Sequence, residues 1–505
     1  MRQRADSLVG FESRAPRFVL IARILFVALL VTVVRAAPSA KTNIIFLFTD
    51  DQAPDAIAAA AEWGNDASAI QTPNMDRLAA GGTRFSRAYN MGAWNGAVCV
   101  ASRSMLNTGL FIWHARAAER DRYATLVNGG RMWSQRMKSA GYETYMSGKW
   151  HVESPADKLF DHVTHVRQGM PSTVPSAYNR PLEGKEDTWL PWDESHGGYW
   201  AGGKHWSEVL ADDADGFIKQ ASTAGKPFFM YLAFNAPHDP RQSPREFVER
   251  YPLEKIRVPE NFLPINPHLQ AMGLGPAGPK GMRDETLAPF PRTELAIKTH
   301  RREYYALVTH LDVQIGRILD ALDRAGVAEN TYVILTADHG LALGRHGLLG
   351  KQSMFEHSVR VPFVIRGPGI PRGEVRDARI YLQDAMATAL DLAGADAAGV
   401  DFKSVMPLIR NERKIQYESI YGAFAAKSQR AVIEGDTKLI LYPATRTVLL
   451  YDLAKDPLET RDLSADPGTS YTKRRLFGKL QSLQHATGDT LDLSKGYPAF
   501  VAPDA

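Results

Sequence analysis

The chain has 505 residues, of which 44% are hydrophobic and 23% charged, so disordered and collagen-like proteins are excluded. This length allows about two to four domains and a large buried core. The formal net charge is +4, but the six arginines and two acidic residues of segment 1–36 account for the whole excess. Residues 37–505 have no formal net charge, so the composition gives no indication of a nucleic-acid-binding surface.

Residues 1–36 have the pattern of an export signal. An arginine-bearing lead precedes an apolar run over 18–34, and small residues follow at 36–40. We predict a secretory signal cleaved near 36–40, with an uncleaved N-terminal membrane anchor as the alternative. No later segment approaches the ~20 apolar residues of a membrane span. Because the chain has one cysteine and thus no internal cystine, a periplasmic or extracellular bacterial location is favoured.

From residue 41, apolar strands alternate with longer helical segments. This alternation predicts an α/β fold with a large, mainly parallel sheet flanked by helices. Residues 43–48 (NIIFLF) are almost continuously apolar, as in a strand buried on both faces. Thr72 is predicted to cap a helix that has Pro73 at its first position and ends at Gly81. Further strands are predicted at 143–147, 227–234, 331–336 and 362–366, and helices at 294–325 and 382–392.

The sequence changes character after about residue 410. An antiparallel hairpin is predicted from two apolar segments, 431–442 and 447–452, which are separated by the four residues 443–446. A helix is predicted at 471–485. We therefore divide the chain into a signal or anchor (1–36), a catalytic domain (37–408) and a small α+β domain with an antiparallel sheet (409–505). The loops 170–205 and 255–292 are rich in Pro, Gly and polar residues, and such loops often build the pocket in α/β enzymes.

Carboxylates follow two of the predicted strands directly. Asp50 and Asp51 come after the first strand, and Asp338 and His339 follow the strand at 331–336. The carboxyl ends of parallel strands meet at one sheet edge, so these side chains are expected to converge. Three carboxylates would repel one another without a cation, and oxygen ligands favour Ca²⁺, with Mg²⁺ as the alternative. Either pair alone could instead be a helix cap or a locally packed histidine.

The single cysteine, Cys99, opens the string CVASRSMLNTG at 99–109, which has a helical pattern. A lone thiol forms no internal disulfide, so its placement calls for a chemical explanation. Arg103, one turn later, would lie on the same helix face as Cys99. Backbone N–H groups at a helix N-terminus also favour a bound anion.

These motifs, in this order, resemble type I sulfatases of the alkaline phosphatase superfamily, in which this cysteine is oxidised to formylglycine. The resemblance extends over nearly all of residues 41–470. The commonest family pattern has proline where Ala101 stands, although alanine also occurs there. Asp338 followed by His339 is more similar to the iduronate-sulfatase and choline-sulfatase branches. The other matching strings are GYETYMSGKWH (141–151), APH (236–238), ADHGLALGRHG (337–347) with Lys351, LYDL (450–453) and DPLET (456–460).

The resemblance implies a hydrated formylglycine at position 99 and a maturase that makes it. One hydroxyl of the hydrate attacks sulfur and displaces the alcohol, which gives a covalent sulfated intermediate. The second hydroxyl then loses its proton, sulfate leaves by C–O cleavage, and the aldehyde returns. A serine or cysteine has no second hydroxyl for this step. The metal ligands implied by the resemblance are Asp50, Asp51, Asp338, His339 and the modified Cys99.

The resemblance also implies roles for the remaining motif residues. Arg103 would hold the hydrate, and Lys149 and Lys351 would bind the sulfate oxygens. His151 would assist turnover of the hydrate, and His238 would protonate the leaving group. Other histidines are left without a role, namely His162, His165, His300, His310, His346 and His357.

The leading hypothesis is an exported sulfatase acting on a sulfated carbohydrate, with no nucleic-acid partner and no membrane contact beyond the N-terminal segment. The aromatic residues of 192–206 could stack on a sugar or anchor their loop, and Arg241 could contact a substrate anion. Three alternatives remain. They are a phosphonate or phosphate monoester hydrolase, a non-catalytic carbohydrate-binding protein with unmodified Cys99, and a thiol hydrolase, for which the carboxylate cluster would have no purpose.

Overall fold

The structure is a computed structural model that describes residues 41–60, 69–274 and 282–501. The predicted export segment, 1–36, lies outside the described residues. The described residues from Thr42 onward belong to one compact unit. Within the described ranges, no helix combines the length and the apolar character needed to cross a membrane.

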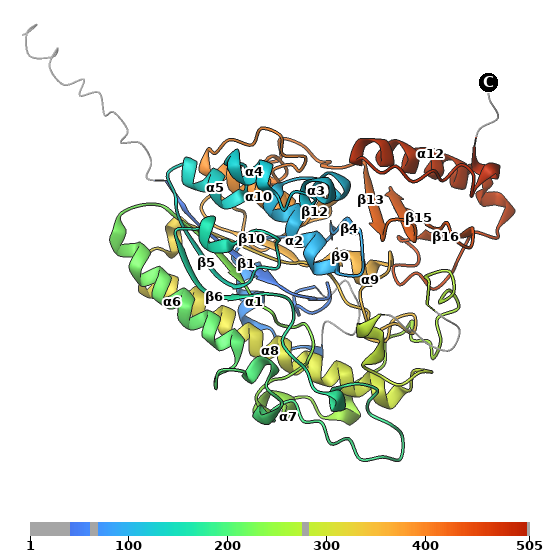
Figure 1. Cartoon of the computed structure of the whole chain (residues 1–505), viewed down its shortest axis with the longest axis horizontal. Coiled ribbons are helices and arrows are strands. Elements are labelled where there is room, and N and C mark those ends of the chain that lie inside the picture. The colour runs from blue at the N-terminus through green and yellow to red at the C-terminus, as the bar shows by residue number, and fades with distance from the viewer. Residues whose placement is uncertain (1–40, 61–68, 275–281, 502–505) are drawn as a thin grey trace, which may run out of the picture. The chain divides into compact units, whose positions relative to one another are not determined.

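An eight-stranded sheet forms the centre of the molecule (Figure 1). Its mainly parallel character confirms the predicted fold class. Its five consecutive parallel strands are β8 (Thr331–Ala337), β1 (Asn43–Thr49), β7 (Phe228–Ala233), β5 (Glu143–Lys149) and β6 (His162–Arg167). The outer strands are β10 (Phe363–Arg366), β2 (Thr83–Phe85) and β11 (Glu374–Arg376). Beyond β8 the sheet continues with β10, antiparallel to β8, then β2, antiparallel to β10, and finally β11, parallel to β2.

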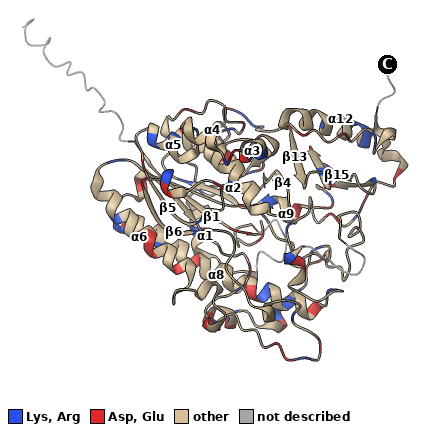
Figure 2. Ribbon diagram, in the orientation of Figure 1, with Lys and Arg blue, Asp and Glu red and all other residues tan. Residues whose placement is uncertain are grey.

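Helices cover both faces of this sheet, and the covering explains the strand sequences. Strands β1, β7 and β8 contain no charged residue, whereas helices α6 and α8 carry charges of both signs (Figure 2). One face is covered by α1 (Pro73–Ala80), α6 (Trp206–Ala224) and α8 (Glu294–Arg324). The other is covered by α2 (Val98–Thr108), α5 (Trp133–Ser139) and α10 (Asp384–Ala393). Shorter helices are α3 (Ile112–Glu119), α4 (Ala124–Asn128), α7 (Arg245–Glu249), α9 (Glu356–Val359) and α11 (Met406–Ile409).

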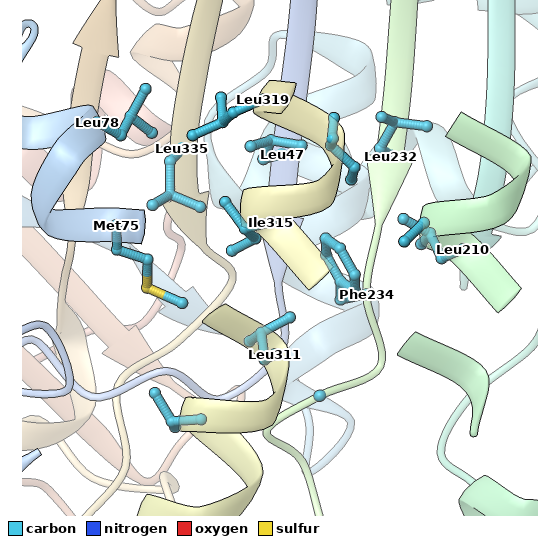
Figure 3. Close-up of a cluster of buried hydrophobic side chains, with 14 of the residues drawn as sticks. Leu47, Met75, Leu78, Leu210, Leu232, Phe234, Leu311, Ile315, Leu319 and Leu335 are labelled. Carbon is cyan, nitrogen blue, oxygen red and sulfur yellow. The ribbon is translucent and has the colours of Figure 1, made fainter. Parts of the chain in front are cut away.

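Alternate residues of β1 pack into the two layers. Leu47 lies in the layer under α8, where Ile315 and Leu319 meet it (Figure 3). Phe46 and Phe48 point to the opposite layer, which contains Trp133 and Leu390 among others. This division follows from the two-residue period of a strand, and it makes a strand buried on both faces apolar throughout.

Helix α1 begins at Pro73 and is followed by Gly81, as predicted, but the predicted cap is wrong. Thr72 makes no capping bond with its side chain. Instead, Asp312 of α8 accepts hydrogen bonds from the backbone N–H groups of Asn74 (3.1 Å) and Met75 (2.7 Å). A carboxylate distant in sequence therefore satisfies the helix terminus that a local residue was expected to satisfy.

The C-terminal region forms a five-stranded sheet with helix α12 (Ser470–Thr487) packed against it. The prediction of one strand over 431–442 is wrong, because a tight turn at Gly435 divides this segment into two strands. The edge strand β4 comes from much earlier in the chain and pairs with β13 in parallel. The strands are β16 (Thr447–Asp452), β15 (Thr437–Tyr442), β14 (Gln429–Glu434), β13 (Ser419–Phe424) and β4 (Gly92–Ala93). The domain boundary at residue 409 stays a prediction.

A third, small sheet links these two regions of the chain. It consists of three two-residue strands, β12 (Ile380–Tyr381), β3 (Ala88–Tyr89) and β9 (Arg360–Val361). Strand β3 is parallel to β12 and antiparallel to β9. Together with β4, it fixes the chain that leads into α2.

Candidate active site

Three carboxylates meet beyond the carboxyl ends of β1 and β8. Thr49 of β1 and Ala337 of β8 are paired in register, so the residues that follow them leave the sheet side by side. The backbone N–H of Asp51 donates to Oδ1 of Asp338 at 3.0 Å. Asp50, Asp51 and Asp338 are all buried. The convergence expected from the strand ends is present.

Arg103 ties this carboxylate group to helix α2. Its Nε donates to Oδ2 of Asp338 at 3.1 Å, and its Nη2 lies 3.7 Å from Oδ2 of Asp50. Its Nη1 donates to the backbone oxygen of Lys149 at 2.8 Å, and the guanidinium stacks 4.6 Å from the ring of Phe48. Since a planar fork makes all of these contacts at once, the side chain is fixed in one place.

Two buried lysines face the same carboxylates. Lys149, the last residue of β5, forms an ion pair with Asp50. Nζ of Lys351 lies 2.6 and 2.5 Å from the two oxygens of Asp51. Burial raises the pKa of Asp51, and although Lys351 opposes this, that pKa is well above its ordinary value. With Arg103, three cationic side chains therefore face three carboxyl groups.

Cys99 is the second residue of α2, as predicted for a side chain at a helix N-terminus. Its Sγ lies 3.3 Å from Oδ1 of Asp50, 3.4 Å from Nζ of Lys351 and 4.0 Å from Oδ1 of Asp51. Burial, Asp338 and Asp50 together hold the pKa of the thiol well above its ordinary value. A thiol in this position stays protonated and is a poor nucleophile, which argues against the thiol-hydrolase alternative.

A group of possible metal ligands surrounds Cys99. Asp50, Asp51, Cys99 and His238 each offer a ligand atom, and these atoms all lie within 4.8 Å of one another. Nε2 of His238 is 3.5 Å from Oδ2 of Asp51, while its Nδ1 lies 2.8 Å from the backbone oxygen of Asp239. Carboxylate oxygens with a neutral imidazole are a donor set that fits a divalent cation.

Asp338 and His339 do not belong to that group of four. Both oxygens of Asp338 are engaged, one by Asp51 and one by Arg103. His339 is buried, its ring is hydrogen-bonded to the backbone of Val98, and its Nε2 has no hydrogen-bond partner. Burial lowers the pKa of His339 to about 4, so the imidazole is neutral. Their roles as metal ligands stay predictions.

A cavity of about 340 Å³ opens above Cys99. His151, two residues beyond β5, lines it with a neutral ring, because burial and Lys149 lower its pKa to about 3. Nδ1 of His151 is buried without a hydrogen-bond partner. The lining consists of Gly96, Ala97, Val98, Cys99, Lys149, His151, Met170, His238, Met282, Arg283, Asp284, Lys351 and Gln352. All of the predicted sulfate-contact and proton-transfer residues thus share one cavity, and their catalytic roles stay predictions.

Several residues that line the cavity were not predicted from the sequence. Asp284 accepts from Nε2 of Gln352 at 2.9 Å and lies 2.6 Å from Nη2 of Arg283. Arg283 also forms a bidentate ion pair with Asp239. Arg283 and Asp284 come from the loop 255–292, and Met170 comes from the loop 170–205. The loops were expected to build a pocket, but no spacing or motif distinguished these individual residues.

The aromatic segment 192–206 anchors its loop and contributes nothing to the cavity lining. Tyr199 is buried and donates to the backbone oxygen of His238 at 3.0 Å. Trp206 lies 3.8 Å beneath the guanidinium of Arg167. The anchoring alternative therefore fits better than the sugar-contact alternative. Arg241 is also buried, and its Nη1 lies 2.7 Å from Nδ1 of His300.

His346, which had no predicted role, joins its motif to the C-terminal region. Its ring stacks on Phe355 with centroids 4.3 Å apart. Its Nε2 lies 3.1 Å from the backbone oxygen of Leu458 and 3.1 Å from Nδ2 of Asn261. These contacts assign a packing role to His346.

The parallel sheet, the carboxylates beyond its strands and the lysines of the cavity fit a hydrolase of anionic esters. The sequence profile described as Sulfatase matches residues 42–395, and the profile described as N-sulphoglucosamine sulphohydrolase, C-terminal, matches residues 344–486. The chain belongs to the sulfatase family and is a sulfuric ester hydrolase.

Several known proteins are similar to this chain in sequence or in fold. An N-acetylglucosamine-6-O-sulfatase of Bacteroides thetaiotaomicron is 26% identical over 88% of this chain and 86% of its own. A choline-sulfatase of Rhizobium meliloti is 27% identical over 79% of this chain and 78% of its own. A protein solved in complex with its substrate D-glucosamine-2-N,6-O-disulfate has a TM-score of 0.68 and 24% identity, with 90% of this chain and 100% of the other chain covered. A phosphonate monoester hydrolase of Agrobacterium radiobacter has a TM-score of 0.67 and 20% identity, with 88% of this chain and 96% of the other chain covered.

Proposed function

We propose that this sulfatase is exported and removes sulfate from a sulfated carbohydrate, using formylglycine formed from Cys99 and a divalent cation. The observation that carries the proposal is the position of Cys99. Its side chain lies between Asp50 and Lys351 on the cavity floor, in surroundings that disfavour a thiolate. The substrate class is supported by the named substrates of the glucosamine-sulfate relatives. Export is supported by the signal pattern in residues 1–36.

The charge balance of the site explains why a cation and an anionic ester belong together. Three carboxylates already face three cationic side chains. A divalent cation, Ca²⁺ or Mg²⁺, held by Asp50 and Asp51 with Asp338 and His339, would give the site an excess positive charge. When bound, it withdraws charge from the reacting oxygens. The monoanionic sulfate group of a substrate would offset part of that excess.

The chain's own cations would bind and orient the substrate. Lys149 and Lys351 line the cavity and would act as point charges on the non-bridging sulfate oxygens. Arg103 holds Asp338 and the backbone of Lys149 in place through Nε and Nη1, and its buried Nη2 has no hydrogen-bond partner. The hydrate of formylglycine would supply the nucleophilic hydroxyl at position 99. Because His151 and His238 line the same cavity, both are placed to hold or move a proton there.

Mass spectrometry and one variant test the proposal. The peptide that contains residue 99, from protein made in its native host, should have the mass of formylglycine in place of cysteine. Cys99→Ala should lose sulfate-ester hydrolysis by at least about 10³-fold while keeping its melting temperature, because the nucleophile is removed from an otherwise intact site. An unmodified thiol combined with full activity in Cys99→Ala contradicts the proposal.

Chelation tests the cation separately. Treatment with EDTA should abolish hydrolysis, and adding back Ca²⁺ or Mg²⁺ to the same sample should identify the ion that restores it. Undiminished activity after exhaustive chelation removes the metal from the proposal and leaves the family assignment untouched.

A phosphonate or phosphate monoester hydrolase is the second candidate, because a phosphonate monoester hydrolase shares the fold with a TM-score of 0.67. Matched sulfate, phosphate and phosphonate monoesters of one alcohol separate the two activities. We expect the largest kcat/KM for the sulfate ester. A clear preference for either phosphorus ester overturns the sulfated-substrate proposal. Saccharide binding without hydrolysis of any ester would support the non-catalytic alternative.

A further inference from the structure

A second cavity, which we name the β11 pocket, lies outside the catalytic site. It has a volume of about 640 Å³, compared with about 340 Å³ for the catalytic cavity. Its walls come from the end of β11, the following residues to Arg379, the segment from Leu408 to Glu418, and Gly435. No residue lines both cavities. A cavity of this size accommodates a ligand of several sugar units.

Four cationic side chains line the β11 pocket, namely Arg376, Arg379, Arg413 and Lys414. Two acidic residues, Asp377 and Glu418, also line it, and two further carboxylates, Glu374 and Asp436, pair with Arg376 and Arg379. The hydroxyl of Ser86 already donates to Asp377.

The three arginines differ in their partners: Arg413 has a neutral acceptor, whereas Arg376 and Arg379 also pair with carboxylates. Nη2 of Arg413 donates to the backbone oxygen of Ser404 at 2.7 Å. Nη1 of Arg376 donates to Oδ1 of Asn411 at 2.9 Å. Among the described residues, neither Arg413 nor Lys414 has an ion pair with a carboxylate, whereas Arg376 pairs with Glu374 and Arg379 with Asp436. Arg413 and Lys414 therefore keep their charge available for an anion.

Exposed apolar side chains stand beside these cations. Val375 is 52% exposed and Ile415 is 64% exposed, and both line the β11 pocket. Exposed large apolar residues next to unpaired cations suit a ligand that is itself both anionic and partly apolar. A sulfated sugar has this character, because its ring presents C–H faces and its sulfate groups present charge.

The β11 pocket lies along the same sheet edge as the catalytic cavity. Strand β11 is parallel to β2, and β2 is related to β8 through two antiparallel pairings, so β11 and β1 end at the same edge. Four strand-to-strand steps separate β1 from β11. At about 4.8 Å per step, the two strand ends are about 19 Å apart, a distance that a short oligosaccharide spans.

We propose that the β11 pocket is a second binding site for the sulfated carbohydrate, with Arg413 and Lys414 contacting its sulfate groups. The choice of ligand rests on the proposed function, since the substrate offers the same anionic chemistry. The site would retain a polymeric substrate near the catalytic cavity and raise the local concentration of sulfate esters there.

Paired variants test the proposal in the full chain. Arg413→Ala/Lys414→Ala removes the two free cations, and Lys455→Ala/Lys495→Ala is the matched control, because it removes two exposed lysines that line neither cavity. In a Cys99→Ala background, we measure the binding of a heparin octasaccharide and of the same octasaccharide after chemical desulfation. The pocket variant should bind the sulfated octasaccharide about tenfold more weakly, and the control should match the parent.

Kinetic measurements on the same paired variants, made in protein that retains Cys99, complete the test. The pocket variant should keep kcat/KM for a small aryl sulfate and lose activity on a long sulfated polymer. Equal octasaccharide affinity in both variants, or equal binding after desulfation, overturns the proposal. Because binding is measured without turnover, a failure to hydrolyse any sulfate ester counts against the proposed function alone.

Discussion

His238 is held in a single tautomer by its own loop. Its Nδ1 lies 2.8 Å from the backbone oxygen of Asp239, so this nitrogen carries a proton and Nε2 presents its lone pair toward Asp51. Arg283 in turn fixes the Asp239 carboxylate with two contacts. Burial and Lys351 hold the pKa of His238 well below its ordinary value. This imidazole can therefore bind a cation, or accept a proton before donating it to a leaving group.

A series of leaving groups distinguishes these two roles of His238. If His238 protonates the leaving oxygen, His238→Ala should reduce kcat for an alkyl sulfate by about 10²–10⁴-fold and for a nitrophenyl sulfate far less, because a good leaving group needs no proton. The measurement is kcat for wild type and variant across sulfate esters of increasing alcohol pKa. A uniform loss across the series would instead show that His238 acts by holding the cation.

At the scale of elements, the contact between α1 and α8 is the clearest case of packing that decides a residue. Asp312 caps α1, and Nδ2 of Asn74 donates to Asp312 at 2.9 Å. Gly316, one turn further along α8, leaves room for this arrangement, because a Cβ there would lie 2.5 Å from the side chain of Asn74. Glycine is unfavourable within a helix by roughly 1 kcal/mol relative to alanine. Its presence at position 316 is therefore explained by the close approach of the Asn74 side chain to α8.

Two glycine-to-alanine changes in helices should therefore have opposite effects. Gly316→Ala is expected to lower the free energy of unfolding by about 1–3 kcal/mol, because Asn74 has to leave Asp312. Gly216→Ala in α6 is the matched control, since its new Cβ meets no atom within 4 Å, and it should raise stability by about 0.5–1 kcal/mol. Urea unfolding of both variants measures the difference. The same sign for both would contradict the packing argument.

The elements also show what the sequence could predict and what it could not. Strands β1, β7 and β8 were predictable because burial on both faces makes them apolar throughout, and Asp50 and Asp338 were predictable as strand-end carboxylates. The cap at Asp312 was not predictable, because it comes from a helix more than two hundred residues away. Strand β4 is only two residues long and exists because β13 pairs with it. The pocket residues Arg283 and Asp284 lie in a loop without a periodic pattern.

At the scale of the whole molecule, a buried ion cluster links the antiparallel sheet to the helical body. Lys438 of β15 lies 2.9 Å from Oε1 of Glu356 in α9 and 2.8 Å from Oε1 of Glu459. The backbone N–H of Glu356 also donates to Glu459 at 2.7 Å. Burial, opposed by Lys438 and reinforced by Glu356, raises the pKa of Glu459 to about 7.

This raised pKa gives a stability difference with a defined sign. Between the ordinary value of 4.5 and about 7, native Glu459 keeps a proton that the unfolded chain releases. The contribution of Glu459 to stability therefore decreases as the pH rises through this window and is constant above it. Glu459→Gln should gain melting temperature relative to wild type as the pH is raised across the window. The exposed Glu254→Gln is the control and should show no such trend; a flat difference for Glu459→Gln would refute the assignment.

The pairing of β4 with β13 limits the time available for the proposed oxidation of Cys99. All residues of α2 except Val100 are buried, so an enzyme that reads the sequence around Cys99 needs that segment before it folds. Gly92 pairs with Ala423, which is synthesised about 330 residues later. At roughly 5–20 residues per second, the β13 segment is made about 15–65 s after β4. The proposed oxidation could therefore take place between the emergence of Cys99 from the ribosome and the pairing of β13 with β4.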